Sequence, residues 1–284
     1  MLKKYYLLTK PGIIRGNVMS GAAGFIFASQ GEIDLGLLIA TLLGTSLVIA
    51  SACVFNNYID RDIDKKMVRT RKRATVTGEI NAKQALTFAS ILGILGFVLL
   101  SVFTNPVTVT IGLVGILSYV IFYGHAKRKT PYGTEVGSIP GATSITAGYT
   151  AVAGSIDIAA AILFLIMVLW QMPHFYSIAL YRLKDYKAAG IPVLPAVSGS
   201  QATKVRIVLY VIAFLVAEIF LVATGNAGYT FLATSVLVGT WWLWSGLKGF
   251  SALDDTKWGG KMFGTSLIAL LAFCTVLSLD AWLP

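Results

Sequence analysis

Residues 35–64, LGLLIATLLGTSLVIASACVFNNYIDRDID, join a long apolar run to a polar end that carries three aspartates. The apolar part, 35–59, exceeds the ~20 residues that an α-helix needs to cross the hydrocarbon core of a bilayer. Hydrophobic residues make up 56% of the 284-residue chain and charged residues only 13%, whereas a soluble domain carries about a quarter charged residues. The stretch therefore predicts a transmembrane helix, and the composition predicts an integral membrane protein.

Apolar segments of similar length recur along the whole chain and are separated by short turns. We predict an all-α fold of nine transmembrane helices around a central cavity, in a single polytopic domain that spans residues 1–284. The predicted spans are 13–29, 35–59, 84–103, 106–124, 136–155, 156–182, 205–224, 227–248 and 262–283.

The cations of the chain are distributed unevenly about these spans. With the N-terminus placed in the cytoplasm, all 23 Lys and Arg residues fall in the N-terminal segment or in the even-to-odd connections. The opposite side carries Glu32, Asp34, Asp157 and Asp280 and no cation. This is the positive-inside pattern, which predicts an N-in, C-out orientation. The net charge of +10 thus reflects membrane topology, and we expect no nucleic-acid partner.

The polar end of the 35–59 run has one functional face. Because a helix advances about 100° per residue, Asn56, Asn57, Asp60 and Asp64 fall within roughly 100° of arc, while Asp62 points away. Carboxylate and amide oxygens suit a hard divalent cation, which commonly arrives with a phosphate. A dense basic run follows at once: Lys65, Lys66, Arg69, Arg71, Lys72 and Arg73. Together they predict a site for a metal-bound diphosphate at the mouth of a membrane helix.

A second polar face lies in WQMPHFYSIALYRLKDYKAAGIPVLP, residues 170–195. On one continuous helix, His174, Tyr181, Arg182 and Asp185 lie within about 100° of one another. The basic loop 125–135 is a third polar segment on the same predicted side. Polar groups inside a membrane are costly and mark functional sites. We therefore expect these loops to converge where the cavity opens to the cytoplasm.

Simpler interpretations exist for each feature. Charged helix ends are commonly solvated caps, a basic run anchors topology, and His174 would also fit a histidine bonded to a neighbouring carbonyl. The functional interpretation is favoured because carboxylates, amides and cations occur together and a second polar face accompanies them.

The motifs resemble those of a known family. The pattern Asn56-Asn57-x-x-Asp60-x-x-x-Asp64 is similar to the first aspartate-rich motif of the intramembrane (UbiA-type) aromatic prenyltransferases. Longer strings resemble the protohaem IX farnesyltransferases, also called haem O synthases. These strings are TKPGIIRGN (9–17), CVFNNYIDRDIDKKMVRT (53–70), WQMPHF (170–175) and KDYKAAGIPVLP (184–195). One departure from the wider superfamily is that Asp185 is followed by Ala189 where a second aspartate often stands.

The resemblance implies transfer of a farnesyl group from farnesyl diphosphate to a vinyl group of haem b, followed by addition of water. Mg²⁺ is the implied cofactor and haem b a substrate; a terminal oxidase or haem A synthase would receive the product. The implied location is a bacterial inner membrane, with the site towards the cytoplasm. Implied catalytic residues are Asn56, Asp60, Asp64 and Asp185, and implied metal ligands are Asp60, Asp64, Asn57 and Asp185. Implied diphosphate-binding residues are Lys65, Arg69, Arg71, Lys72 and Arg73, and implied haem contacts are His174, Tyr181, Arg182 and Lys184.

Three other functions remain open at this point. A quinone-type prenyltransferase would modify an aromatic acid instead of haem. A polytopic transporter would also need intramembrane polar faces, although it would be expected to have polar groups leading to both sides. A haem-delivery partner of an oxidase would need no aspartate pair.

Overall fold

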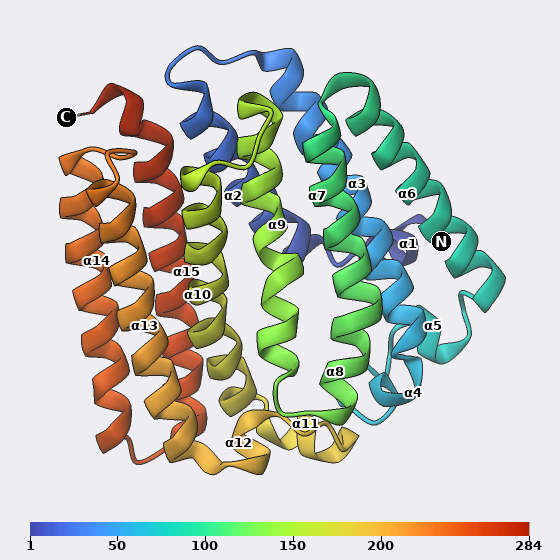
Figure 1. The fold of residues 1–284 in the computed structure, drawn as a ribbon. Coiled ribbons are helices and arrows are strands. Elements are labelled where there is room, and N and C mark those ends of the chain that lie inside the picture. Colours follow the sequence, from blue (N-terminus) through green and yellow to red (C-terminus); the bar gives the residue numbers. More distant parts are fainter. Residues whose placement is uncertain (284) are drawn as a thin grey trace.

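The computed structural model describes residues 1–283 of the chain, and these residues form helices and connecting loops with no strand. Figure 1 shows long helices running roughly side by side, with several short helices at one end of the bundle. The long helices are α2 (Pro11–Ser29), α3 (Leu35–Ile59), α6 (Ala82–Phe103), α7 (Pro106–Leu117), α9 (Gly133–Ala153), α10 (Ile158–Tyr181), α13 (Gly199–Ala223), α14 (Tyr229–Leu247) and α15 (Asp255–Leu279). The short ones are α1 (Leu2–Leu8), α4 (Arg61–Asp64), α5 (Ala74–Thr77), η1 (Ser118–Tyr123), α8 (Gly124–Lys129), α11 (Leu183–Ala189), α12 (Leu194–Val197), η2 (Lys248–Ser251) and η3 (Asp280–Trp282).

Helices occupy every apolar range that the sequence predicts as a span. Within residues 1–283, six are both long and apolar enough to cross a membrane: α3, α6, the continuous stretch Pro106–Lys129, α10, α13 and the stretch Asp255–Trp282. The other three predicted ranges are filled by α2, α9 and α14. The protein is therefore an all-helical membrane-spanning chain.

Small residues allow some of these helices to pack backbone against backbone. A Cβ added at Gly148 of α9 would lie 1.9 Å from the carbonyl oxygen of Gly21 on α2, so only glycine fits there. In a membrane, where lipid is as apolar as the side chains, such close approach is a principal source of helix association. The contact fixes α2 against α9.

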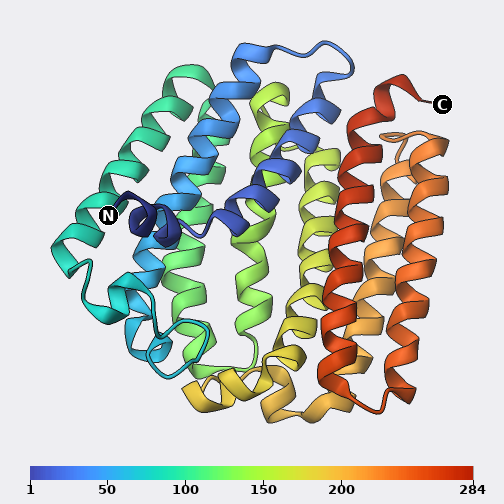
Figure 2. The same cartoon turned by 180° about the vertical axis from the view of Figure 1, so that it is seen from behind.

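The largest apolar core lies in the second half of the chain. It is built around α10 together with α13, α14 and α15, and Figure 2 shows these last three helices grouped on one side of the molecule. Because α10 packs against α9 on one side and against α13 and α15 on the other, it joins the two halves. A polar group on α10 is thus placed between them.

The predicted spans 35–59 and 156–182 end where the structure ends them, within one residue, but helical geometry does not continue beyond them to Asp64 or Asp185. Helix α3 ends at Ile59, and Asp60 leaves helical geometry with φ −87° and ψ 1°. Helix α10 ends at Tyr181, and Arg182 (φ −110°, ψ 20°) separates it from α11. The prediction that Asp185 shares one continuous helix face with His174 is therefore wrong.

The break after Tyr181 has a physical reason. Ala189 and Ile191, at the end of α11, bury themselves against Ile63 and Met67 from the segment that follows α3. A straight continuation of α10 would leave these apolar side chains without partners at the end of the bundle. Helices α4, α5, α8, α11 and α12 consequently gather at one end, as Figure 1 shows.

Candidate functional site

The polar end of α3 is buried within the protein and does not cap the helix in water. The residues Asn56, Asn57, Asp60 and Asp64 are each between 1% and 3% exposed. Asp62, which the helical geometry turns away, is exposed. Buried carboxylates require partners, because an uncompensated charge removed from water is costly.

Asp60 is paired with two cations from α8. Lys127 forms an ion pair with its Oδ2, and Nη2 of Arg128 lies 3.3 Å from its Oδ1. Arg128 also donates to the carbonyl of Ile59 at 2.7 Å and reaches the exposed Asp62 at 2.8 Å. Its hydrogen bond holds the pKa of Asp62 at about 2. Helix α8 thus closes one side of the acidic end of α3.

Asp64 is paired with the last residue of the basic run. Nη1 of Arg73 lies 2.5 Å from Oδ2 of Asp64 and donates to Oδ1 of Asn57 at 3.0 Å. The intervening chain folds back because the Thr70 hydroxyl donates to the backbone oxygen of Asp64 at 2.9 Å. The turn therefore brings one member of the basic run onto the acidic face.

The other members of that run lie at the surface. Lys65, Arg69, Arg71 and Lys72 are exposed. Of the five residues predicted to bind diphosphate, only Arg73 contacts the buried aspartates. The diphosphate-binding role of the remaining four stays a prediction.

A fourth cation reaches the site from the N-terminal segment. Lys10 donates from Nζ to Oδ1 of Asn56 at 2.7 Å and to the hydroxyl of Tyr119 at 3.4 Å. Desolvation of its ammonium lowers the pKa of Lys10 to about 8. Its backbone adopts the left-handed region, φ 53° and ψ 64°, which a lysine rarely occupies. The segment is anchored by Asn57, whose Nδ2 donates to the carbonyl of Leu8 at 2.7 Å.

Two tyrosines lie beside Lys10 and Lys127. The π-helical segment η1 widens the helical turn and places Tyr119 and Tyr123 with ring centroids 5.3 Å apart. Nζ of Lys127 lies 5.1 Å from the centroid of the Tyr123 ring. Local π-helical turns are rare and recur at functional sites. The sequence pattern gave no indication of this one.

Asp185 approaches the same end of the bundle from the second half of the chain. It is half-buried on α11. The apolar side of α11 packs on Ile63, which precedes Asp64 in the chain, and on Met67. Its neighbour Tyr186 has a pKa raised to about 12 by burial, an effect that the positive charge of Arg69 opposes. No cation within residues 1–283 pairs with Asp185.

The predicted haem contacts fall into two groups. His174 is buried on α10 and its Nδ1 lies 2.8 Å from the hydroxyl of Ser266 on α15. Tyr181 and Lys184 are exposed, and the guanidinium of Arg182 lies 4.3 Å from the centroid of the Tyr181 ring. The first group is inside the bundle, and the second is at its end, beside α11.

The oxygen donors suit a metal that brings further ligands with it. Within residues 1–283, no three His, Cys, Asp or Glu side chains are close enough to hold a metal ion by themselves. Mg²⁺ commonly keeps several waters and binds through one or two carboxylates plus substrate phosphates. The two buried carboxylates Asp60 and Asp64 meet that requirement. Beside them, the N–H groups at Nδ2 of Asn56 have no hydrogen-bond acceptor in the described chain.

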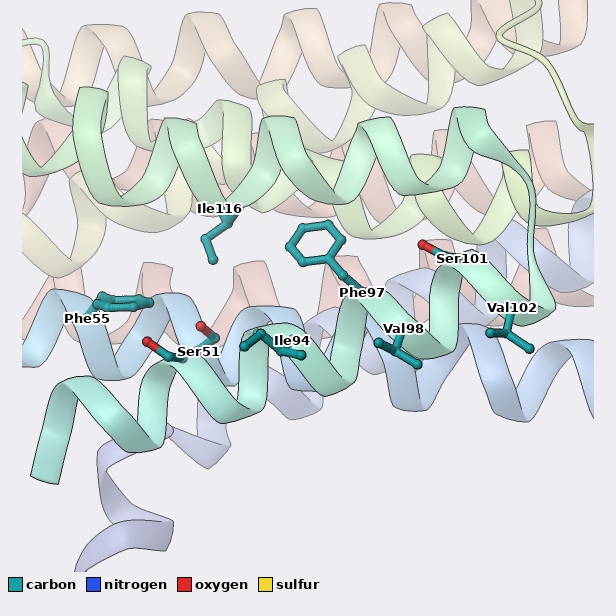
Figure 3. A pocket seen from close by; sticks show the side chains of 10 residues that line it. Ser51, Phe55, Ile94, Phe97, Val98, Ser101, Val102 and Ile116 are labelled. Carbon is teal, nitrogen blue, oxygen red and sulfur yellow. The ribbon is translucent and has the colours of Figure 1, made fainter.

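An apolar groove is separate from this cluster. It measures about 600 Å³ and lies between α3, α6 and α7 with an almost wholly apolar lining. Figure 3 labels Ser51, Phe55, Ile94, Phe97, Val98, Ser101, Val102 and Ile116 around it. It carries no charged side chain and therefore no acid–base or metal chemistry.

Sequence reasoning missed three of the cations that contact the α3 face. Lys10, Lys127 and Arg128 come from segments distant in sequence, and no local pattern pairs them with Asp60 or Asn56. The only available signal was that the basic loop 125–135 was predicted on the same side of the membrane.

Comparison with known proteins identifies the family of the chain. The family described as "UbiA prenyltransferase family" matches residues 17–273. The protein named protoheme IX farnesyltransferase of Yersinia enterocolitica is 49% identical over 285 residues, covering 100% of this chain and 96% of that protein. The protein of the same name from Shigella flexneri is 50% identical over 285 residues, again covering 100% and 96%.

Solved structures share the fold at low sequence identity. A structure of a digeranylgeranylglyceryl phosphate synthase has a TM-score of 0.81 at 20% identity and covers 99% of this chain and 98% of its own. A UbiA homolog from Archaeoglobus fulgidus, bound to GPP and Mg²⁺, has a TM-score of 0.74 at 17% identity and covers 97% and 99%. The arrangement of helices is therefore that of intramembrane prenyltransferases.

Proposed function

We propose a reaction for this chain, which belongs to the UbiA prenyltransferase family: it transfers a farnesyl group from farnesyl diphosphate to a vinyl group of haem b. The carbon–oxygen bond to diphosphate breaks, a carbon–carbon bond to the vinyl group forms, and water then supplies a hydroxyl group and releases a proton. The protein is a membrane prenyltransferase, and relatives that match its full length carry the name protoheme IX farnesyltransferase. The observation that carries the mechanism is the pair of buried carboxylates, Asp60 and Asp64, each held by cations.

The topology that we propose has nine spans, with the N-terminus inside and the C-terminus outside. It is supported by helices in all nine predicted ranges and by the basic segments α8 and 61–73, which lie together at one end of the bundle. The relatives come from Gram-negative bacteria such as Yersinia and Shigella, so we assign the chain to the inner membrane with its site towards the cytoplasm.

We assign Mg²⁺ to the acidic end of α3. Asp60 and Asp64 would supply its protein oxygens, with Asn57 beside them and Asp185 on the facing helix α11. When bound, the metal neutralises charge on the diphosphate as it departs. A solved relative of the same fold is described with GPP and Mg²⁺, which supports this assignment.

The cations of the site bind the diphosphate in this mechanism. Lys127, Arg128 and Arg73 already lie against the carboxylates, and Lys10 lies against Asn56. Positive groups fixed in place before the reaction stabilise the charge that develops on a leaving group without further reorganisation. The exposed residues Lys65, Arg69, Arg71 and Lys72 attract the diphosphate and guide it towards the buried cations.

The remaining residues contact the farnesyl group and the haem in this mechanism. The rings of Tyr119 and Tyr123 offer faces that stabilise an allylic cation, and the surrounding bundle excludes water until the carbon–carbon bond has formed. We assign His174 to the haem iron, Tyr181 to the haem ring, and Arg182 or Lys184 to the propionates. The product is then available to a terminal oxidase or a haem A synthase.

Product analysis tests the proposal. Haem extracted from membranes with and without the protein should differ by the mass of one farnesyl group plus water, and the difference should require Mg²⁺ and farnesyl diphosphate. Membranes that contain the Asp60→Asn variant are the control. Unchanged haem, or a prenylated hydroxybenzoate in its place, would contradict the proposal and favour the quinone-type reaction.

A further inference from the structure

The imidazole of His174 is enclosed by aromatic rings. Trp170 stacks on it with ring centroids 4.7 Å apart, and Phe263 of α15 lies at 5.0 Å. Phe175 meets it edge-on at 5.2 Å. The residue is only 9% exposed, so the orientation of its ring is fixed by packing on three sides.

A chain of hydrogen bonds also fixes which ring nitrogen carries the proton. The hydroxyl of Ser266 donates its single hydrogen to the carbonyl of Phe263 at 2.6 Å. With that hydrogen engaged, its oxygen is the acceptor available to Nδ1 of His174, which lies 2.8 Å away. A neutral imidazole protonated at Nδ1 has a free lone pair at Nε2. Within residues 1–283, no group hydrogen-bonds to Nε2.

Ser266 itself is held in place from α10. The indole Nε1 of Trp170 donates to the backbone oxygen of Ser266 at 2.8 Å. Two turns before Ser266, a Cβ added at Gly259 would lie 3.0 Å from the carbonyl oxygen of Ser177, so α15 lies close against α10 here. The two helices thus form a rigid frame around the imidazole.

We propose that Ser266 is a positioning residue that keeps His174 in the Nδ1–H tautomer and presents Nε2 to the iron of the haem substrate. The inference rests on the proposed function, because it takes haem b as the substrate. Histidines that bind metals commonly donate their second ring N–H to an oxygen, which sets the tautomer and the ring orientation. The hydroxyl of Ser266 is that oxygen here, and the three aromatic rings packed on the imidazole hold its orientation.

The structural role of Ser266 and its proposed role can be separated by spectroscopy. Purified full-length protein is titrated with haem b, and the absorption spectrum of the nitrogen-ligated iron and the haem affinity are recorded. We expect His174→Ala to abolish the nitrogen-ligated spectrum. Ser266→Ala should weaken haem affinity by about 10- to 100-fold, the usual effect of removing such a partner. Ser266→Thr, which keeps the hydroxyl, should retain the spectrum.

Two controls guard against misfolded variants. Thr265→Ala removes a neighbouring hydroxyl that bonds to the carbonyl of Met262 and does not contact His174, so haem binding should be unchanged. In His174→Gly, free imidazole should restore the nitrogen-ligated spectrum, which shows that the pocket remains formed.

The outcomes separate the two proposals. If the wild-type protein converts no haem b to its farnesylated product, the proposed function fails whatever the spectra show. If the product forms but Ser266→Ala binds haem with the wild-type spectrum and affinity, the role of Ser266 is refuted and the reaction stands. A wild-type complex without a nitrogen-ligated spectrum, or one that His174→Ala leaves unchanged, also refutes the inference.

Discussion

The two acidic helix ends of this protein differ in how they are held. Asp60 and Asp64 are both buried. Asp60 pairs with cations from α8, and Asp64 pairs with Arg73 of the basic run. Asp185 is half-buried on α11, and no cation in residues 1–283 pairs with it. A buried carboxylate needs a partner before any substrate arrives, since an unpaired buried charge is strongly destabilising. The first end is therefore preorganised, whereas the second is left available for what binds between them.

The largest effect should come from the preorganised end. Asp60→Asn preserves shape but removes the charge that Lys127 and Arg128 hold and that the metal needs. Prenyl transfer should fall about 1000-fold, comparable to the loss of a principal electrostatic group in an active site. The initial rate at saturating Mg²⁺ is the measurement, with Asp62→Asn as the exposed matched control. A loss below tenfold would mean that the buried pair is structural.

A smaller effect should follow at the open end. Asp185→Asn leaves no buried cation without its partner, so the thermal unfolding midpoint should not change. Because Asp185 approaches the same site, we expect the rate to fall about 10- to 100-fold, within the range for a positioned group that assists a reaction. Both variants are assayed under identical conditions. A larger loss of rate for Asp185→Asn than for Asp60→Asn would contradict the expectation that the preorganised end contributes more to the reaction.

The basic run provides a third test, because only one of its members is drawn into the site. Arg73→Ala removes the guanidinium that bridges Asp64 and Asn57, and KM for farnesyl diphosphate should rise about tenfold, the equivalent of ~1.4 kcal/mol of lost binding. Lys72→Ala changes an exposed neighbour and should alter KM by less than about threefold, in keeping with the small energies of exposed charges. Equal effects would show that proximity to the buried carboxylates is unimportant.

The smallest effect concerns Asp62, the exposed aspartate of the same motif. Its pKa is lowered to about 2 by Arg128, so this pair stabilises the folded state above the unfolded pKa of about 4 and loses that contribution as pH falls towards 2. Because the side chain is 62% exposed, Asp62→Asn should cost less than about 1 kcal/mol at pH 7. Unfolding midpoints of the variant and wild type should converge at about pH 2 and below. A difference that persists there would contradict the assignment.

Hydropathy located the helices, because the length and apolarity of a membrane span are local properties of the sequence. The pattern also identified Asn56, Asn57, Asp60 and Asp64 as one face, and the structure buries all four together. It was wrong to continue the face of α10 beyond its span to Asp185, since the break at Arg182 depends on Ala189 and Ile191 packing against a distant segment. Local periodicity contains no information about that contact.

The partners of the predicted residues were less accessible to sequence reasoning. Lys10, Lys127 and Arg128 reach the site through tertiary packing, and Ser266 meets His174 only because α15 lies against α10. The strings that carry the family resemblance contain Lys10 and His174 but assign no role to Lys10. Candidate residues were thus found by their type and local spacing, and their pairings required the fold.

The left-handed backbone at Lys10 and the bond from Asn57 to Leu8 connect the beginning of the chain to the acidic end of α3. Leu8 and Lys10 consequently belong to the candidate site, and the short helix α1 that precedes them packs against α3. A purification tag or reporter fused to Met1 would be attached close in the chain to the lysine that contacts Asn56. Expression vectors that leave this end unmodified should therefore give the more active enzyme.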